Sequence, residues 1–345
     1  MKQIPIAIVG LNFGRLIVDE LLSAQNRRKF QIVAVCDQDR PKAHAMGHRL
    51  KCKVYTNLDT LLADPGIRAI GLYTGPNGRA GLLRKVIRAG KDVMTTKPFE
   101  VDPEAALSVL REAKRLKRII HLNSPGPLLS DDLKQIVTWR DKFNLGRPVA
   151  ARAEAWASYG ETTDGSWYDD PKRCPVAPVF RLGIYLINDL AHFFGEPRDV
   201  QVLHSRLLTG RPTPDNAQLG IRFKNGGLVN IFASFCVDDL QYYRNSLTIN
   251  FERGTVYRNV GPFPRVPGSE VAAALEMATH RKGKPLVRRK SLTKGLSGSY
   301  QWDTFHRALH GANLPDAVSP AEIATGLRII AAMARAEKSG ETEKV

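Results

Sequence analysis

The segment that most constrains the fold is Ile6-Ala7-Ile8-Val9-Gly10-Leu11-Asn12-Phe13-Gly14-Arg15, near the amino terminus. Apolar, β-favouring residues lead into a turn that contains glycine, and an amphipathic helical pattern follows. A sheet that binds a dinucleotide begins in this way, because the turn lets the backbone approach a pyrophosphate and the helix N-terminus offers unpaired N–H groups. Asn12 and Arg15 stand where the pattern GxGxxG has glycine, and asparagine tolerates left-handed backbone. Taken alone, the segment also fits a plain strand–turn–helix.

A carboxylate follows the second apolar run, residues 31–36, which predicts the second strand. Asp37 at its end can accept hydrogen bonds from the adenosine ribose hydroxyls and would repel a 2′-phosphate, so it favours NAD. Arg40 and Lys42 follow closely and keep NADP open. Since strand-end and helix-capping aspartates are common, Asp37 is informative only together with Gly10.

Strand and helix patterns alternate up to about residue 125, with further strands predicted at 53–55, 69–74, 92–95 and 118–122. Such alternation with short loops predicts an α/β fold, a Rossmann-type parallel sheet wound on both faces. Ligands bind outside the carboxyl ends of the strands in such sheets. The residues expected to bind the cofactor at that edge are Gly10, Asn12, Phe13, Gly14, Arg15, Asp37, Thr74, Gly75, Pro76, Asn77, Thr96, Lys97 and Asn123.

The pattern changes after about residue 125. It predicts helices at 130–143 and 180–194, strands at 149–155, 201–208, 217–223, 228–235, 246–251 and 255–258, and a loop at 159–178. Asn225-Gly226 between alternating runs is a strong hairpin signal. The second half is therefore predicted to be an α+β domain with an open, mostly antiparallel sheet.

The remaining segments complete the predicted domain organisation. Residues 261–299 are rich in proline, glycine and basic residues and are expected to form mostly a long loop, with helices at 302–310 and 320–336. We expect a dinucleotide-binding domain at 1–125 and a substrate-binding and oligomerisation domain at 126–318. A C-terminal helix at about 319–338 is expected to pack back on the first domain. Residues after Lys338 are expected to fray.

Composition limits the class of protein. The 345 residues are 43% hydrophobic, enough for two domains, and no apolar run is long enough to span a membrane. The start Met1–Pro5 lacks a signal-peptide layout, so we expect a soluble cytoplasmic protein. The four cysteines are scattered without metal-ligand or redox spacing, which predicts reduced thiols and no metal.

The net charge of +17 is compatible with a nucleic-acid partner or an acidic ligand. The basic residues are dispersed through predicted helices, aromatic residues do not interleave with them, and no nucleic-acid motif occurs. We therefore expect a solvated basic surface and no nucleic-acid partner, while a polyanionic or phosphorylated substrate stays open.

Two residues could carry acid–base chemistry. Lys97 follows a predicted strand, and its ammonium group can donate to a substrate oxygen and lower the pKa of a neighbouring acid. Arg181, Tyr185 and Asn188 have the spacing i, i+4, i+7 and so share one face of a mostly apolar helix. Buried polar groups need partners, supplied either by a ligand cavity or by backbone and a nearby loop. A nearby cation would make Tyr185 a usable proton donor or acceptor.

Several motifs together carry a family resemblance. They are the glycine turn, Thr74-Gly75-Pro76-Asn77, the run from Gly90 to Pro98, the run from Gly183 to Asn188, and Asp215-Asn216-Ala217 before Lys224-Asn225-Gly226. Over essentially the whole chain this arrangement resembles the GFO/IDH/MocA family of NAD(P)-dependent oxidoreductases. The resemblance implies a Rossmann domain, an open mixed-sheet domain, hydride transfer on sugars, polyols or related alcohols, and a homodimer or homotetramer.

The chain departs from the family pattern at several positions. The family usually has Glu before Lys-Pro, and this chain has Thr96. Many members carry Asp-x-Gly-x-His and a further Asp, where this chain has Arg181, Tyr185 and Asn188. Tyr185 resembles the branch in which Tyr takes the place of the catalytic His. Arg181 in place of an acid suggests an anionic substrate group or a loss of activity.

The leading hypothesis is an NAD(P)-dependent oxidoreductase, with NAD favoured, acting on a carbohydrate-like hydroxyl or carbonyl. Lys97 would polarise the reacting oxygen and Tyr185 would exchange its proton, the two facing each other across one nucleotide-filled cleft. The substrate, sugar-like or anionic, would be bound by Trp167, Tyr168, Arg181 and Asn188. One alternative is a nucleotide-sensing regulatory or partner-binding protein that has kept the fold and lost the chemistry. A third is a lyase or hydrolase that uses the cofactor transiently.

Overall fold

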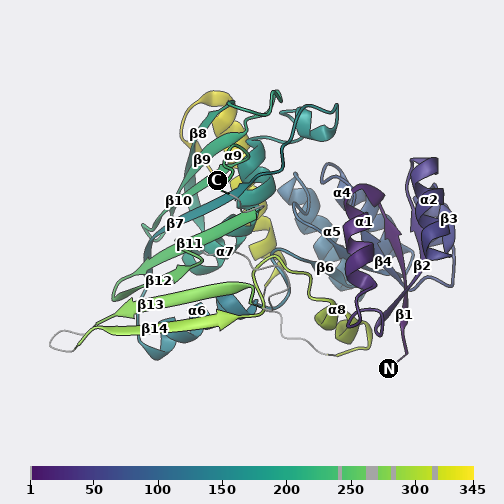
Figure 1. The fold of residues 1–345 in the computed structure, drawn as a ribbon, viewed down its shortest axis with the longest axis horizontal. Helices are drawn as coiled ribbons and strands as arrows, with labels where there is room; N and C mark the ends of the chain where they lie inside the picture. Colours follow the sequence, from purple (N-terminus) through teal and green to yellow (C-terminus); the bar gives the residue numbers. More distant parts are fainter. Residues whose placement is uncertain (1, 240–242, 262–270, 281–284, 313–317) are drawn as a thin grey trace. The chain divides into compact units, whose positions relative to one another are not determined.

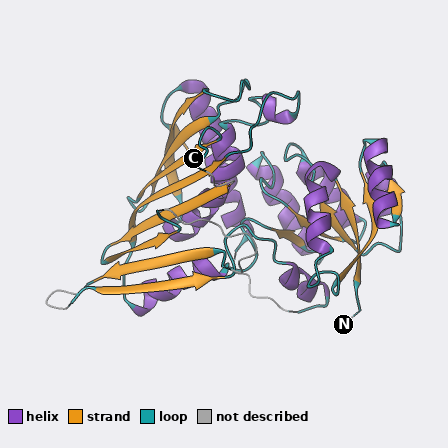
Figure 2. Ribbon diagram, in the orientation of Figure 1, coloured by secondary structure: helices purple, strands orange, loops and turns teal. Residues whose placement is uncertain are grey.

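The computed structural model describes residues 2–239, 243–261, 271–280, 285–312 and 318–345, which form two compact units (Figures 1 and 2). Unit 1 comprises residues 1–128 and 300–320, and unit 2 comprises residues 129–299 and 321–345.

Unit 1 is built on a six-stranded parallel sheet with the strand order β3-β2-β1-β4-β5-β6. Its strands are β1 (Ile4–Val9), β2 (Phe30–Cys36), β3 (Lys53–Tyr55), β4 (Ala69–Leu72), β5 (Asp92–Thr95) and β6 (Ile120–Leu122). Its helices are α1 (Leu11–Leu21), α2 (Arg40–Leu50), α3 (Leu58–Leu62), α4 (Arg79–Arg88), α5 (Pro103–Arg115) and α8 (Trp302–Leu309). The strand order reverses between β1 and β4, and this switch point is where ligands bind in such sheets.

The central strand β1 is buried along almost its whole length because helices cover both faces of the sheet. Ile4, Ile6 and Ile8 alternate onto one face and pack with apolar side chains of α1 and α8 in one cluster. Elsewhere in the unit, α4 packs on β5 and against α5. The doubly wound parallel sheet predicted from the alternating sequence pattern is confirmed.

Unit 2 is built on a nine-stranded mixed sheet with the order β14-β13-β12-β11-β7-β10-β9-β8-β15. The strands are β7 (Pro148–Ala157), β8 (Pro197–Ser205), β9 (Asn216–Phe223), β10 (Leu228–Ser234), β11 (Tyr243–Phe251), β12 (Gly254–Arg258), β13 (Ala273–Thr279), β14 (Val287–Thr293) and β15 (Glu343–Lys344). The strands β7 and β10 run parallel, and the other neighbouring strands run antiparallel. The predicted hairpin at Asn225-Gly226 is confirmed, since it joins β9 to β10.

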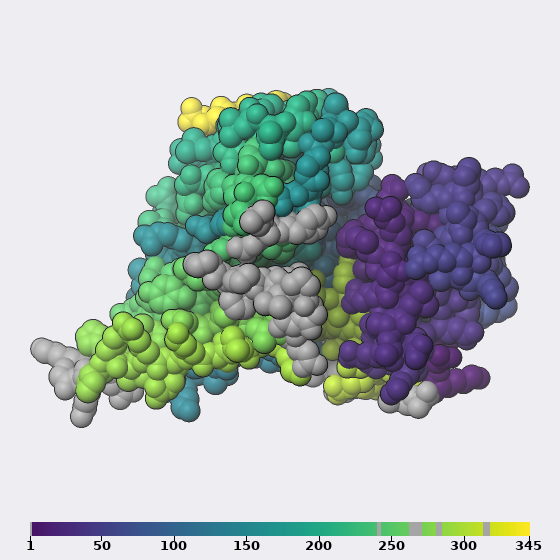
Figure 3. Space-filling model, in the orientation of Figure 1, coloured from purple at the N-terminus to yellow at the C-terminus, as the bar shows by residue number. Residues whose placement is uncertain are grey.

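Helices cover one face of this sheet. The helix α6 (Asp131–Lys142) packs on β13 and β14, and α7 (Ile184–Phe194) packs on β7 and β10 (Figure 1). No helix of the described chain covers the other face, and in the space-filling view the strands of residues 243–293 lie at the surface (Figure 3). Leu203 and Leu228 point to this open face and are 64% and 58% exposed, respectively, because side chains alternate along a strand.

Two predictions for the second half are wrong. The expected loop at 261–299 contains the paired strands β13 and β14, although residues 262–270 and 281–284 lie outside the described residues. The strand β14 lies at an edge of the sheet, where lysine and arginine are frequent. Its basic composition therefore resembled that of a loop, and the strand was not predicted. The tail after Lys338 is not frayed, because β15 pairs with β8 and Arg335 donates to the Lys344 carbonyl.

The last helix, α9 (Pro320–Ser339), also differs from the expectation that it packs on the first domain. It belongs to unit 2, where the Glu337 carboxylate accepts from the Val176 N–H at 3.0 Å and Arg328 lies 3.1 Å from Glu196. The segment that returns to unit 1 is instead 300–320, which carries α8. No helix in the described part of the chain is both long and apolar enough to cross a bilayer.

Candidate cofactor and substrate sites

The glycine turn lies where β1 and β4 end side by side. Gly10 has φ +84°, and a Cβ built on it would lie 2.8 Å from the Tyr73 carbonyl oxygen and 3.1 Å from the Thr74 nitrogen. Both the left-handed backbone and the close approach therefore require glycine at this position. A Cβ on Gly14 would lie 3.0 Å from the Ile8 side chain, so this glycine lets α1 pack closely on β1.

The first turn of α1 presents backbone N–H groups at this edge of the sheet. Gly10 gives the helix no side-chain cap, and its first turn carries no acidic residue. The Leu11 N–H donates to Asp37 Oδ2 at 2.7 Å. The N–H groups of Asn12 and Phe13 lie in the same turn, where helix geometry provides no carbonyl partner, so they suit a pyrophosphate.

The structure brings Asp37 to the glycine turn together with a lysine. In addition to its bond from Leu11, the Asp37 carboxylate accepts from the Asp39 N–H at 2.9 Å. The Lys42 ammonium donates to Asn12 Oδ1 at 2.7 Å and lies 3.4 Å from the Asp39 carboxylate. The carboxylate that favours NAD and the cation that keeps NADP open thus both lie beside the first turn of α1.

A buried arginine that the sequence interpretation missed connects the loops after β4 and β5. Arg79, the first residue of α4, is 1% exposed and donates to the carbonyl oxygens of Thr74, Thr96 and Pro98. Burial lowers the pKa of Arg79 to about 10, so the guanidinium stays charged at neutral pH. A basic residue at a helix N-terminus opposes the helix dipole, and this was the available sign that Arg79 has another partner.

A buried carboxylate, Glu100, reinforces the same junction and was also missed. It accepts from the N–H groups of Gly78 at 3.2 Å and Ala80 at 2.7 Å. These are N–H groups at the start of α4, where a negative charge is stabilised. The loop with Thr74, Gly75, Pro76 and Asn77 is therefore held between two strand ends by buried polar contacts.

Lys97 lies in the loop after β5, and its backbone is fixed from β6. The Lys97 N–H donates to Asn123 Oδ1 at 2.9 Å, and Asn123, directly after β6, is buried. With Arg79 holding the carbonyls of Thr96 and Pro98, the backbone on each side of Lys97 is tied to its surroundings. The unit 1 residues predicted to bind a cofactor all follow strand ends on one edge of the sheet.

In unit 2, Tyr185 lies in the first turn of α7, directly after a π-helical turn (Val179–Gly183). Such turns occur frequently at functional sites. Tyr185 is half-buried, and Gly298 packs against its ring: a Cβ on Gly298 would lie 2.5 Å from both Cδ1 and Cε1.

Arg181 lies within an ion-pair and aromatic cluster. Its two terminal nitrogens both donate to the Glu161 carboxylate, and its guanidinium lies 3.7 Å from the centre of the Tyr168 ring and 4.5 Å from that of Phe235. Burial raises the pKa of Tyr168, opposed by the charge of Arg181, so the phenol stays protonated at neutral pH. The charge of Arg181 is thus balanced inside the protein by a carboxylate from the loop 159–178.

The other predicted substrate residues contact different segments. The rings of Trp167 and Tyr168, in a short 3₁₀ turn (Trp167–Asp169), lie 4.3 Å apart. Asn188 is buried against α9, where a Cβ on Gly326 would lie 2.2 Å from its Oδ1. Arg181, Trp167 and Tyr168 therefore gather in one cluster, whereas Tyr185 packs on Gly298 and Asn188 packs on α9.

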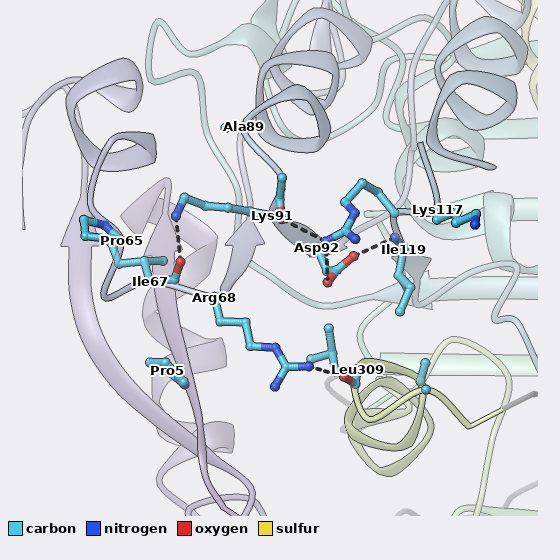
Figure 4. A pocket seen from close by; sticks show the side chains of 14 residues that line it. Pro5, Pro65, Ile67, Arg68, Ala89, Lys91, Asp92, Lys117, Ile119 and Leu309 are labelled. Carbon is cyan, nitrogen blue, oxygen red and sulfur yellow. Dashed lines mark hydrogen bonds and ion pairs between the residues drawn. The ribbon is translucent and has the colours of Figure 1, made fainter. Parts of the chain in front are cut away.

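A cavity of about 690 Å³ lies at the opposite edge of the unit 1 sheet, where the strands begin (Figure 4). Its lining includes Arg68, Lys91, Asp92, Arg118 and Ile119. These residues precede or open β4, β5 and β6, so the cavity is far along the strands from the glycine turn.

Three of the cations that line this cavity, Arg68, Lys91 and Arg118, have structural partners. Arg68 donates to the carbonyl of Leu309, at the end of α8 (Figure 4). Arg118 donates to the carbonyl of Gly90, just after α4, at 2.9 Å. Lys91 donates to the Ile67 carbonyl at 2.6 Å. Since cations stabilise helix C-termini, the contacts of Arg68 and Arg118 account for these two side chains without a ligand.

The strand order, the glycine turn and the strand-end carboxylate define unit 1 as a dinucleotide-binding Rossmann domain. Within the described ranges, no group of three or more His, Cys, Asp or Glu side chains is arranged to hold a metal ion. Two family models match the chain: an oxidoreductase family with an NAD-binding Rossmann fold over residues 4–124, and the GFO/IDH/MocA C-terminal domain over residues 134–257. The chain therefore belongs to the GFO/IDH/MocA family, as its motifs predicted, and its N-terminal unit is an NAD(P)-binding domain.

Known proteins similar to this chain agree with that assignment. An uncharacterised oxidoreductase of Schizosaccharomyces pombe is 34% identical over an alignment of 216 residues that covers 58% of this chain and 54%, about half, of that protein. The UDP-N-acetylglucosamine 3-dehydrogenase of Acidithiobacillus ferrooxidans is 21% identical over 69% of this chain and 73% of its own length. The aldose-aldose oxidoreductase of Caulobacter crescentus, solved with glycerol, has the same fold, with a TM-score of 0.74 and 18% identity over 100% of both chains.

Proposed function

We propose that this protein is an NAD(P)-dependent oxidoreductase that transfers a hydride between nicotinamide and a carbohydrate-like hydroxyl or carbonyl. The observation that carries the proposal is the common edge of unit 1, where the glycine turn, Asp37 and the clamped loop of Lys97 all follow strand ends. The relatives support the substrate class, since their names include a UDP-N-acetylglucosamine dehydrogenase and an aldose-aldose oxidoreductase.

The proposed cofactor site uses mainly backbone groups. The turn from Gly10 to Arg15 would hold the pyrophosphate, because its first helical N–H groups carry partial positive charge. Asp37 would accept from the ribose hydroxyls, which favours NAD over NADP. The loops 74–77 and 96–97 and Asn123 continue this edge and would hold the nicotinamide, which supplies the hydride donor or acceptor when bound.

Lys97 and Tyr185 would carry the proton chemistry. During oxidation of a hydroxyl, the bound nicotinamide would supply the hydride acceptor, and the Tyr185 phenolate would accept the proton of the substrate oxygen. The Lys97 ammonium would donate a hydrogen bond to that oxygen and polarise it. Reduction runs the same steps in reverse, with Tyr185 as the proton donor.

The pairing of Arg181 favours a neutral, sugar-like substrate over an anionic one. Its two terminal guanidinium nitrogens already donate to Glu161. An anionic group would have to displace this buried carboxylate, and breaking a buried ion pair is costly. We propose that Trp167 and Tyr168 form an aromatic wall, on which the apolar face of a sugar ring can pack, and that Asn188 orients a hydroxyl.

The homodimer or homotetramer expected from the sequence would use the open face of the unit 2 sheet. This face exposes Leu203, Leu228 and Tyr257, and exposed apolar surface of this kind favours association. Light scattering of the purified protein measures the oligomeric state.

The experiment that tests the function combines two variants with a substrate panel. Initial rates are measured with NAD⁺ and NADP⁺ on aldoses, polyols and UDP-N-acetylglucosamine. We expect Lys97→Ala and Tyr185→Phe each to lower kcat by roughly 10²–10⁴-fold, the usual contribution of a positioned acid or base, with NADH affinity within about twofold. The control variants Lys134→Ala and Tyr257→Phe, at positions outside the site, should keep full turnover. Undiminished turnover in both site variants would refute the assignment.

A regulatory function is the second candidate, because Arg181 occupies a position that is usually acidic in this family and is held in an internal ion pair. In that case the protein would bind NADH in a fluorescence titration but oxidise no member of the panel. A partner protein recovered with the chain, and competing with NADH, would favour this function.

A further inference from the structure

We propose that Gly298 and the hydrogen bond between Ser297 and Asp189 position the ring of Tyr185 for proton transfer. The inference rests on the proposed function, in which the Tyr185 phenol exchanges the substrate proton. It assigns a role to the segment directly after β14, which was predicted from the sequence to be part of a long loop.

The Tyr185 ring packs against Gly298. A Cβ on Gly298 would lie 2.5 Å from Cδ1 and Cε1 and 3.4 Å from Cζ, the carbon that carries the phenol oxygen. The glycine backbone therefore lies directly against one edge of the ring, too close for any other residue. Gly298 also has φ +92°, a left-handed value that favours glycine. Two independent features thus require glycine at this position.

The segment is held on α7 by its neighbour in sequence. The Ser297 hydroxyl donates to Asp189 Oδ1. Asp189 follows Tyr185 by four residues, so the two side chains lie on the same side of α7, one turn apart. Ser297 is therefore fixed over one turn of the helix while Gly298 lies against the turn before it.

Asp189 is itself held rigidly by a buried arginine. The other oxygen of its carboxylate, Oδ2, accepts from Arg258 at 2.9 Å. Arg258 is 0% exposed and also donates to Asp132 at 2.7 Å and to Asn245 at 2.7 Å. Because each of these groups is buried and paired, rotation of the Asp189 side chain would leave a buried charge without its partner.

Positioning matters because a tyrosine ring can swing about two side-chain bonds, and proton transfer requires hydrogen-bond distance from the reacting oxygen. A displacement of about 1 Å at a reacting group can lower the rate by about 100-fold. The chain Arg258–Asp189–Ser297–Gly298 thus connects the buried core of unit 2 to the ring that is proposed to move the proton.

The test compares three variants in the full-length protein. Gly298→Ala places a methyl group in the space of the ring, and Ser297→Ala removes the hydroxyl that holds the segment. Gly226→Ala is the matched control, because Gly226 has φ +87° and an added Cβ there meets nothing within 4 Å. The control carries the same backbone cost without any contact to Tyr185.

We expect Gly298→Ala to lower kcat by roughly 10–100-fold on the substrate that Tyr185→Phe oxidises more slowly than the wild type, with NADH affinity unchanged. Ser297→Ala should have a smaller effect in the same direction, and Gly226→Ala none. A double variant separates positioning from damage elsewhere: in the Tyr185→Phe background, Gly298→Ala should lower the residual rate no further.

A second readout needs no substrate. In protein labelled with 3-fluorotyrosine, the ¹⁹F resonance of Tyr185 is assigned as the one missing from the Tyr185→Phe variant. Gly298→Ala should shift this resonance and change its titration with pH, whereas Gly226→Ala should leave both unchanged.

The inference is overturned if Gly298→Ala leaves the Tyr185 resonance and its titration as in the control, or if it slows the Tyr185→Phe background as much as the wild type. Retention of full turnover by Tyr185→Phe would instead overturn the proposed function, and the fluorine resonance would still decide the positioning of the ring.

Discussion

Two buried arginines, one in each unit, satisfy their guanidinium groups with different kinds of acceptor. Arg79 in unit 1 donates to four backbone carbonyls, whereas Arg258 in unit 2 donates to the carboxylates of Asp132 and Asp189. Burial lowers the pKa of Arg79 to about 10 and outweighs the opposing influence of Tyr300 and Glu100. Burial also acts on Arg258, but the charges of Asp189 and Asp132 outweigh it and raise the pKa of its guanidinium.

Arg79 therefore holds backbone groups in place, whereas Arg258 holds side chains in place. Arg79 fixes the loops whose backbone is proposed to face the cofactor, and neutral carbonyls suffice as its partners. Arg258 fixes the Asp189 side chain on α7 through an ion pair. This contact requires the positive charge of the guanidinium and the negative charge of the carboxylate. Replacement of Arg79 should therefore mainly weaken cofactor binding to unit 1. Replacement of Arg258 should mainly lower the stability of unit 2.

The largest effect is expected for Arg258→Leu. The variant leaves Asp132 and Asp189 buried without their cation, and breaking a buried ion pair in this way costs about 3–5 kcal/mol. Urea unfolding followed by circular dichroism measures the loss. Arg288→Leu, on the exposed edge strand β14, is the control and should change stability by less than about 0.5 kcal/mol. A loss below 1 kcal/mol for Arg258→Leu would contradict the contrast between the two arginines.

The next effect is expected for Arg79→Leu. This variant leaves buried carbonyl groups rather than charges without partners, at about 1–3 kcal/mol. The loops with Thr74 and Thr96 lose their common anchor, so NADH affinity should fall by about tenfold or more while Tyr185 is unaffected. Fluorescence titration with NADH measures the affinity. If NADH binding is unchanged while global stability falls as far as in Arg258→Leu, the two arginines play the same role.

The two regions also differ in how far the sequence predicted them. Gly10 and Asp37 were predicted correctly as strand-end residues because their signal is local: an apolar run and the residue that follows it. Arg79 and Glu100 were missed because a buried charge is defined by partners far along the chain. The spacing of Arg181, Tyr185 and Asn188 predicted that they share a helix, but it did not predict their contacts. Those contacts are with Glu161, Gly298 and α9, which lie in segments that the helical pattern does not relate to this helix.

The strands β13 and β14 show the same limit for the fold. Their segment looked like a loop because glycine, proline and basic residues interrupt it, yet Leu275 and Met277 are buried on the covered face of the sheet. Two alternating apolar residues are a weak signal by themselves. They form a strand here because β12 offers a neighbour to pair with, which is tertiary information.

A smaller effect is expected at the adenosine end of the cofactor site. Asp37→Ser removes the carboxylate that would repel a 2′-phosphate and leaves Lys42 beside Asn12. A charged hydrogen bond contributes about 1.5–3 kcal/mol, so the preference for NADH over NADPH should fall by about tenfold or more. The ratio of the two dissociation constants measures it, with Asp19→Ser on the outer surface of α1 as the control. An unchanged ratio would show that Asp37 does not bind the ribose of the cofactor.

The smallest effect is expected when the pH is lowered. This prediction compares one aspartate from each unit. Hydrogen bonds from Lys53, then Tyr55, hold the pKa of Asp64 well below its usual range, and hydrogen bonds from Arg211, then Ser166, do the same for Asp164.

Since each pKa is lower in the folded protein than in the unfolded chain, each carboxylate stabilises the fold above the unfolded value of about 3.9, and this stabilisation is lost as the pH falls toward the folded value. The melting temperature should therefore fall between pH 5 and pH 2, and Asp64→Asn and Asp164→Asn should each make that fall shallower. Calorimetry across this range tests the sign. Both carboxylates lie in contacts near solvent, so each change should stay well below that of Arg258→Leu, whose partners are fully buried. A steeper fall in either asparagine variant would mean that its carboxylate destabilises the folded protein.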